Sequence, residues 1–162
     1  MFGNDHEGMT RGSISDEQII RDAVKLVNEG LAVILLVKGR SMLPFILGGQ
    51  ESAVLTRPGE IRPGDVVLAR INGCRYVLHR VMEVDADRVV LMGDGNYRGQ
   101  EICRKEDVLA RTDEVVAADG THRRLDTPKA RRRARLWRRL LPVRRWLLAI
   151  YKRTIIRNIP IQ

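Results

Sequence analysis

Three residues of this sequence have side chains suited to acyl transfer and lie in segments that would hold them in place: Ser41, His79 and Asp94. Ser41 lies in residues 38–44, where a glycine and a proline bracket it, so the local backbone would fix its position. His79 alternates with valines along a predicted strand, which places the imidazole among apolar neighbours. Burial disfavours the imidazolium and lowers its pKa, so a neutral His79 could take the proton of a serine nucleophile.

Each of these signals has a common structural explanation when it is taken singly. A serine between glycine and proline is usually a turn former, and a histidine on an apolar strand face is usually a satisfied core residue. Asp94 lies in a Gly-Asp-Gly-Asn turn, which could orient the histidine ring or simply close a loop. The order and spacing of the three residues favour the catalytic interpretation over three unrelated structural roles.

The elements that must position these residues are mostly strands. Ser15 and Gln18 form a capping box for a predicted helix that ends at Gly30. Residues 31–37 read as a strand buried on both faces, and further strand patterns cover 52–56, 66–71, 75–84, 88–92 and 114–118. Asn72-Gly73 predicts a hairpin that pairs residues 66–71 with the strand holding His79. The predicted fold class is mainly β, with twisted antiparallel sheets, an N-terminal helix and a basic helical C-terminal tail.

The charge of the chain divides sharply near residue 126. Residues 1–126 hold 17 Lys and Arg and all 20 Asp and Glu, whereas residues 127–162 hold 12 Lys and Arg and no acidic residue. The pattern predicts a disordered N-terminus at 1–12, one folded domain at 13–126 and a separate tail at 127–162. Cys74 and Cys103 read as reduced thiols; no metal site or cofactor is expected.

The tail reads as an amphipathic helix that Pro142 divides into two. Its apolar stripe consists of Leu136, Leu140, Val143, Leu147 and Tyr151. Two interpretations remain open: the region from Arg131 to Arg153 binds an anionic membrane surface, with Trp137 and Trp146 near the headgroups, or the stripe packs on the body. Nucleic acid is a weaker third option, because no reading motif is present. No spanning segment or signal peptide is apparent, so we expect a cytoplasmic protein, peripheral at the inner membrane face if the tail binds lipid.

The sequence resembles the signal peptidase I and LexA-type serine peptidase superfamily over roughly residues 31–118. The matching segments are Gly39-Arg40-Ser41-Met42-Leu43-Pro44, Pro63-Gly64-Asp65-Val66-Val67, Leu78-His79-Arg80-Val81 and Gly93-Asp94-Gly95-Asn96. A histidine at the base position is similar to the variant found in archaeal and endoplasmic reticulum signal peptidases. The chain would be a small form that lacks their transmembrane anchor.

The resemblance implies that residues 13–126 form a peptidase-like domain and assigns roles to the matched residues. Ser41 would attack a peptide carbonyl, His79 would take its proton, and the acyl-enzyme would then be hydrolysed. Gly39, Arg40 and Met42 belong to the nucleophile loop, whose backbone N–H groups would stabilise the oxyanion. Asp94 is the preferred third member because it matches the shared turn, with Glu101 as the alternative.

The function implied is a serine endopeptidase that processes an extended peptide of the signal- or leader-peptide kind. The competing hypothesis is a catalytically silent β domain that uses its cationic tail to bind a membrane, a protein or nucleic acid.

Overall fold

The computed structural model describes residues 16–154. Its elements are α1 (Asp16–Asn28), β1 (Val33–Leu36), β2 (Ser52–Thr56), β3 (Val66–Ile71), β4 (Arg75–Val84), β5 (Arg88–Met92), β6 (Glu101–Arg104), the short 3-10 helix η1 (Lys105–Asp107), β7 (Val108–Val116), β8 (His122–Arg124), α2 (Pro128–Arg139) and α3 (Arg144–Thr154). The predicted disordered segment 1–12 and the capping residue Ser15 lie outside the described residues. The mainly β fold class is confirmed.

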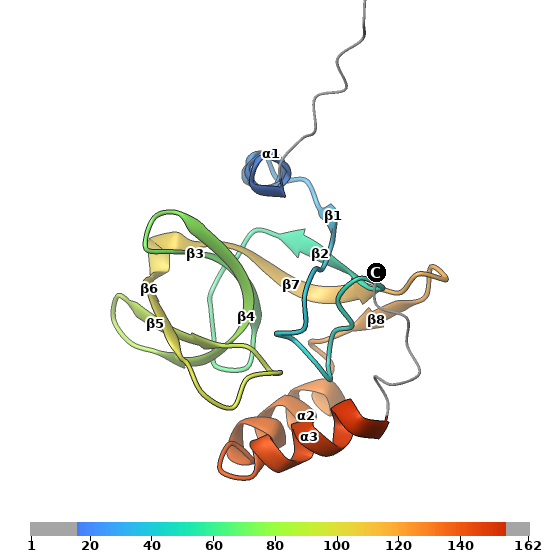
Figure 1. Ribbon diagram of the computed structural model, residues 1–162. Coiled ribbons are helices and arrows are strands. Elements are labelled where there is room, and N and C mark those ends of the chain that lie inside the picture. The colour runs from blue at the N-terminus through green and yellow to red at the C-terminus, as the bar shows by residue number, and fades with distance from the viewer. Residues whose placement is uncertain (1–15, 155–162) are drawn as a thin grey trace, which may run out of the picture.

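The strands form one antiparallel sheet that curls into a half-barrel (Figure 1). The strand order is β1-β2-β7-β3-β4-β5-β6. β8 pairs with the last residues of β7, on the same edge of β7 as β3. Register shifts, which bend a sheet locally, interrupt the pairing of β4 with β5 between Val81 and Glu83 and of β3 with β7 between Leu68 and Ala69. The curl also brings β3 and β6 close to each other.

The predicted hairpin around Asn72-Gly73 is confirmed. Ile71 pairs with Arg75, so the loop has three residues, 72–74, and Asn72 and Gly73 within it have positive φ, 51° and 74°. β3 pairs with β4 so that Val67 lies opposite His79. The turn therefore fixes the register of the strand that holds His79.

The prediction that residues 31–37 are buried on both faces is wrong. β1 is the edge strand of the sheet, and Ile34 and Leu36 are 61% and 48% exposed. Val33 and Leu35 point the other way and pack on the core. A continuous apolar segment therefore does not show that both faces of a strand are buried, because only one face of β1 packs on the core.

Two apolar clusters lie on either side of the curled sheet. The first contains residues of α1, β2, the loop after β1 and the outer faces of β3 and β7: Ala23, Val27, Val37, Met42, Ile46, Ala53, Leu55, Val66, Leu68, Ala110 and Val115. The second fills the half-barrel: Val67, Ala69, Ile71, Val77, Val81, Val89, Leu91, Cys103 and Val108. Alternation along β4 therefore sends its side chains into different environments.

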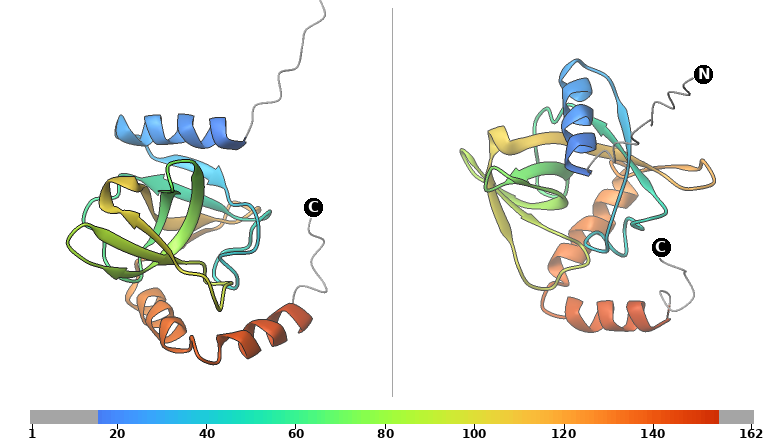
Figure 2. Two further views of the ribbon diagram at one scale, coloured as in Figure 1. Left: turned by 60° about the vertical axis from the view of Figure 1, so that its left-hand side comes forward. Right: turned by 45° about the horizontal axis from the view of Figure 1, so that its top comes forward.

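The basic tail forms two helices, as predicted, with Pro142 between them. Thr127 caps α2 by accepting a hydrogen bond from the Ala130 N–H at 3.2 Å. α2 and α3 lie together on the side of the β body opposite α1 (Figures 1 and 2). Within residues 16–154, no helix has the length and apolar character needed to span a bilayer.

Candidate active site

Ser41 lies in a loop, residues 38–50, that is closed at its base and anchored at its centre. The Gly49 N–H donates to the Val37 carbonyl at 2.7 Å. A Cβ on Gly48 would lie 1.8 Å from the Gly39 carbonyl oxygen, so the two ends approach more closely than any side chain allows. The fully buried Met42 holds the loop in the first apolar cluster. The backbone around Ser41 is therefore fixed by packing on both sides.

The Gly93–Asn96 turn supports Ser41 from behind. The Gly95 N–H donates to the Ser41 carbonyl at 2.7 Å. A Cβ on Gly93 would lie 2.4 Å from that same oxygen, and one on Gly95 would lie 2.3 Å from the Arg40 oxygen. Both positions require glycine because the loop that holds Ser41 lies directly against the turn.

His79 lies on β4 beside the start of this turn. Its neighbour Arg80 pairs with Met92, so the antiparallel register puts His79 next to Gly93. The imidazole is 6% exposed, and burial is the main cause that lowers its pKa from the ordinary value. Glu101 opposes this shift but does not reverse it. A neutral ring near neutral pH is the form that a general base needs.

The carboxylate that faces His79 is Glu101, at the start of β6. Its Oε2 lies 2.9 Å from Nδ1 of His79, while Arg75 pairs with its Oε1. The angles of this contact do not meet those of a hydrogen bond, since both atoms remain without a hydrogen-bond partner within residues 16–154. Nε2 of His79 also makes no hydrogen bond there. Glu101 thus lies where it could orient the ring through Nδ1 and leave Nε2 for proton transfer.

Asp94, the residue preferred from sequence as the third member, has a different partner. Its carboxylate is 1% exposed and accepts three hydrogen bonds from Arg80: Nε to both oxygens at 2.8 and 3.0 Å, and Nη2 to Oδ2 at 2.6 Å. Arg80 projects from the face of β4 opposite His79. The structure therefore brings Glu101 to His79 and gives Asp94 to Arg80.

Ser41 and His79 are not joined by a hydrogen bond in this uncomplexed state of the described chain. Uncomplexed serine sites often have loose contacts that tighten with substrate. The backbone N–H groups of Ser41 and Met42 donate to no acceptor within residues 16–154. These two N–H groups could stabilise an oxyanion.

Two tail residues contact the turn behind Ser41, and sequence reasoning missed both. Trp137 donates through Nε1 to the Asp94 carbonyl at 3.0 Å. Arg144 is 1% exposed and donates to the carbonyls of Asn96 at 3.2 Å and of Trp137 at 2.8 Å. Nothing in the local sequence distinguishes the buried Arg144 from the exposed arginines of the same segment.

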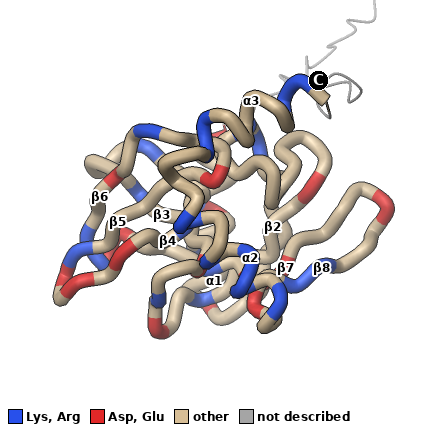
Figure 3. The backbone as a smooth tube through the Cα atoms, turned by 90° about the horizontal axis from the view of Figure 1, so that it is seen from below, with Lys and Arg blue, Asp and Glu red and all other residues tan. Residues whose placement is uncertain are grey.

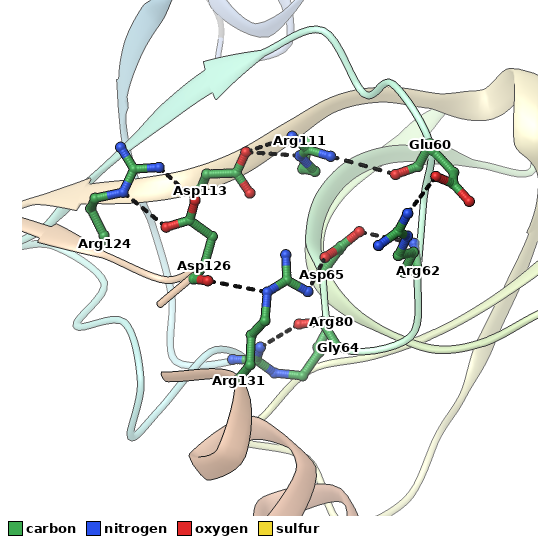
Figure 4. A network of polar contacts seen from close by, with 10 residues as sticks. All are labelled: Glu60, Arg62, Gly64, Asp65, Arg80, Arg111, Asp113, Arg124, Asp126 and Arg131. Carbon is green, nitrogen blue, oxygen red and sulfur yellow. Dashed lines mark hydrogen bonds and ion pairs between the residues drawn. The ribbon is translucent and has the colours of Figure 1, made fainter. Parts of the chain in front are cut away.

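Further polar contacts join the tail to the body around Asp65 (Figure 4). Asp65 Oδ2 accepts from the Arg62 N–H at 2.9 Å, and Oδ1 lies 3.5 Å from Arg131 of α2. Arg80 reaches the neighbouring Gly64 carbonyl at 2.7 Å. The arginine that binds Asp94 is thus held at the point where α2 meets the β body.

A groove of about 540 Å³ separates the loop after Ser41 from the tail helices. Its lining residues are Pro44, Phe45, Leu47, Glu51, Arg123, Arg133, Leu136, Trp137, Leu140 and Tyr151. The Phe45 and Trp137 rings meet edge to face at its floor, 5.8 Å between centroids. No cluster of three or more metal-ligating side chains occurs in the described range, 16–154.

Comparison with known proteins adds one match. No curated protein sequence matches this chain closely. Residues 6–115 match the family described as Peptidase S24-like; the matched range covers α1 to β7 and includes Ser41, His79 and Glu101 but not the tail. This match covers most of the chain, and the curled antiparallel sheet is consistent with it. The chain therefore belongs to the Peptidase S24-like family.

Proposed function

We propose that this protein is a serine endopeptidase in which Ser41 is the nucleophile, His79 the general base and Glu101 the group that orients the base. The observation that carries the proposal is the buried His79, whose lowered pKa keeps it neutral while Glu101 lies 2.9 Å from Nδ1. A core histidine needs no carboxylate, but a base that becomes transiently charged is stabilised by one.

The reaction would proceed in two acyl transfers. Nε2 of His79 takes the hydroxyl proton as the Ser41 oxygen attacks the peptide carbonyl carbon. The N–H groups of Ser41 and Met42 stabilise the oxyanion, an effect worth about 3–4 kcal/mol per donor in other serine peptidases. His79 then gives the proton to the leaving amine, the C–N bond breaks, and water attacks the ester with His79 again acting as base.

The edge strand β1 supports an extended peptide as substrate. One backbone edge of β1 has no strand partner among residues 16–154, and the strand leads directly into the Ser41 loop. An extended peptide can add to such an edge through main-chain hydrogen bonds, which would bring its carbonyl groups to Ser41. Processing of signal- or leader-type segments fits this geometry, because those segments are cleaved while extended.

A fluorophosphonate probe, which phosphonylates activated serines with loss of fluoride, tests the proposal. The parent chain should be labelled at Ser41, as read by the mass of the modified peptide, and Ser41→Ala should not be labelled. Ser52, which starts β2 outside residues 38–50 and pairs with Leu36, provides Ser52→Ala as the matched control that keeps labelling. A folded parent that resists the probe would favour the alternative function, a catalytically silent binding module.

A further inference from the structure

The two tail helices have an apolar surface that the β body does not cover. Three large apolar side chains are strongly exposed there: Val143 at 45%, Trp146 at 67% and Ile150 at 61%. We call these three residues the outer tail face. Exposed apolar side chains of this size that gather on one element are unusual in a surface that meets only water.

The spacing along α3 separates this face from the side that packs on the protein. Val143, Trp146 and Ile150 follow one another at steps of three and four, so they share one side of the helix. Arg144 and Leu148, which are 1% and 2% exposed, lie on the other side and contact the body. One side of α3 therefore packs on the body, as one of the two interpretations from sequence expected, and the other side stays exposed.

The charge around the outer tail face has one sign. Residues 127–154 carry eleven Lys and Arg and no acidic side chain. Eight of the eleven are exposed and form no ion pair with any residue in 16–154: Lys129, Arg132, Arg133, Arg135, Arg139, Arg145, Lys152 and Arg153. Figure 3 views the molecule from the side where these helices lie. A face that was adapted only to water would normally mix both signs.

We propose that the outer tail face binds anionic phospholipid membranes, with α2 and α3 lying in the plane of the headgroups. The apolar side chains would enter the acyl boundary, while the surrounding cations contact lipid phosphates. Trp146 is the residue best suited to the interface, because its ring is apolar and its N–H is polar.

Other occupants fit the same observations less well. A nucleic acid would use the cations but would leave Trp146 and Ile150 without an apolar partner. A second copy of the chain could cover the apolar residues, but it would bring two cationic surfaces together without a single acid between them. An anionic bilayer matches both the charge and the apolar area.

Membrane binding by this face would also position the peptidase site. The inner side of the same helices holds the Gly93–Asn96 turn through Trp137 and Arg144. The nucleophile loop would then lie close to the lipid, at a fixed orientation, within reach of segments that emerge from the membrane surface. The lipid contact itself does not depend on the proposed peptidase activity.

Flotation of the full chain with vesicles tests the proposal. Vesicles of equal parts phosphatidylglycerol and phosphatidylcholine should bind the protein, and vesicles of phosphatidylcholine alone should not. Trp146→Glu should lower the partition coefficient about tenfold or more. It removes a ring that the membrane would bury and adds a negative charge that anionic lipids repel. Arg135→Gln and Arg139→Gln should each lower it about fivefold and make its loss with salt less steep, because each removes one screened contact.

Leu26→Glu on α1 is the matched control, since Leu26 is also exposed, at 41%, but lies at the opposite side of the molecule. It should leave flotation unchanged. The emission of Trp146, taken as the difference between the parent and Trp146→Phe, should shift to the blue on anionic vesicles.

Three results would overturn the proposal. They are equal binding to both vesicle types, unchanged flotation of Trp146→Glu, and a parent that ignores vesicles while binding duplex DNA or forming a dimer that Trp146→Glu abolishes. No part of this experiment measures cleavage. The flotation result can therefore be interpreted even if the protein shows no peptidase activity.

Discussion

The indole of Trp137 donates its N–H to the backbone carbonyl of Asp94 at 3.0 Å, and this bond joins the tail to the turn that supports Ser41. One residue further along that turn, the Gly95 N–H donates to the Ser41 carbonyl. The family match covers residues 6–115, so this contact comes from a part of the chain outside the matched residues. The turn behind Ser41 is thus held by a segment that the family match does not cover.

The first prediction concerns Trp137 as a positioning residue. Trp137→Phe keeps an aromatic ring against Phe45 but removes the donor to Asp94, a hydrogen bond worth about 1 kcal/mol. We expect the labelling rate of Ser41 to fall about fivefold, with little change in the binding of a reversible peptide inhibitor. Leu136→Ala, next to it but exposed, should keep the labelling rate. A purely structural role would instead lower thermal stability and leave labelling of the folded fraction intact.

The second prediction separates the two carboxylates that the sequence could not distinguish. Glu101→Gln should lower the rate of Ser41 labelling by about tenfold or more, because it removes the charge that orients the base. The free energy of unfolding should change little. Asp94→Asn should cost about 3–5 kcal/mol of unfolding free energy, because it leaves Arg80 buried without its partner. Urea unfolding and labelling kinetics on both variants give the comparison. If Asp94→Asn abolished labelling in a stably folded protein, Asp94 and not Glu101 would be the orienting residue.

Part of this fold could be read from the sequence because its signals are local. The strands β2 to β5 have the predicted bounds, since each is an apolar segment between glycine or proline turns. β6 and β8 were missed because they are short strands rich in charged residues. β7 begins at Val108, earlier than the predicted start at 114, because its first half is partly polar.

The candidate site, like the fold, could be predicted from the sequence only where its signals are local. Motif spacing identified Ser41, His79 and the glycine turn, whose contacts are set by neighbouring loops. The choice between Asp94 and Glu101 depends on the curl of the sheet, which brings the start of β6 to β4 across the half-barrel. No local pattern encodes that approach. Trp137 was missed for the same reason, since only tertiary packing reveals that α2 reaches Asp94.

The third prediction is the pH dependence of catalysis. His79 acts as a base only when neutral, and burial lowers its pKa below the usual value of about 6.5. The rate of Ser41 labelling should therefore rise with pH along a limb whose midpoint lies below about 6.5, and should be level above neutrality. In Glu101→Gln the midpoint should move lower still, because Glu101 raises the pKa of His79. An alkaline midpoint, as a lysine base would give, contradicts the assignment.

The final prediction follows from the same pKa and concerns stability. In the unfolded chain His79 has its ordinary pKa of about 6.5, so between that value and the lower native pKa the unfolded state binds more protons. The stabilisation from a neutral buried His79 is fully present above about pH 6.5 and is lost as the pH falls through the native pKa. The free energy of unfolding, measured by urea titration, should fall across this window with a slope of at most about 1.4 kcal/mol per pH unit. His79→Gln should remove this part of the slope, whereas His122→Gln, at an exposed strand position, should keep it. If both variants retained the full slope, His79 would not be the group that titrates.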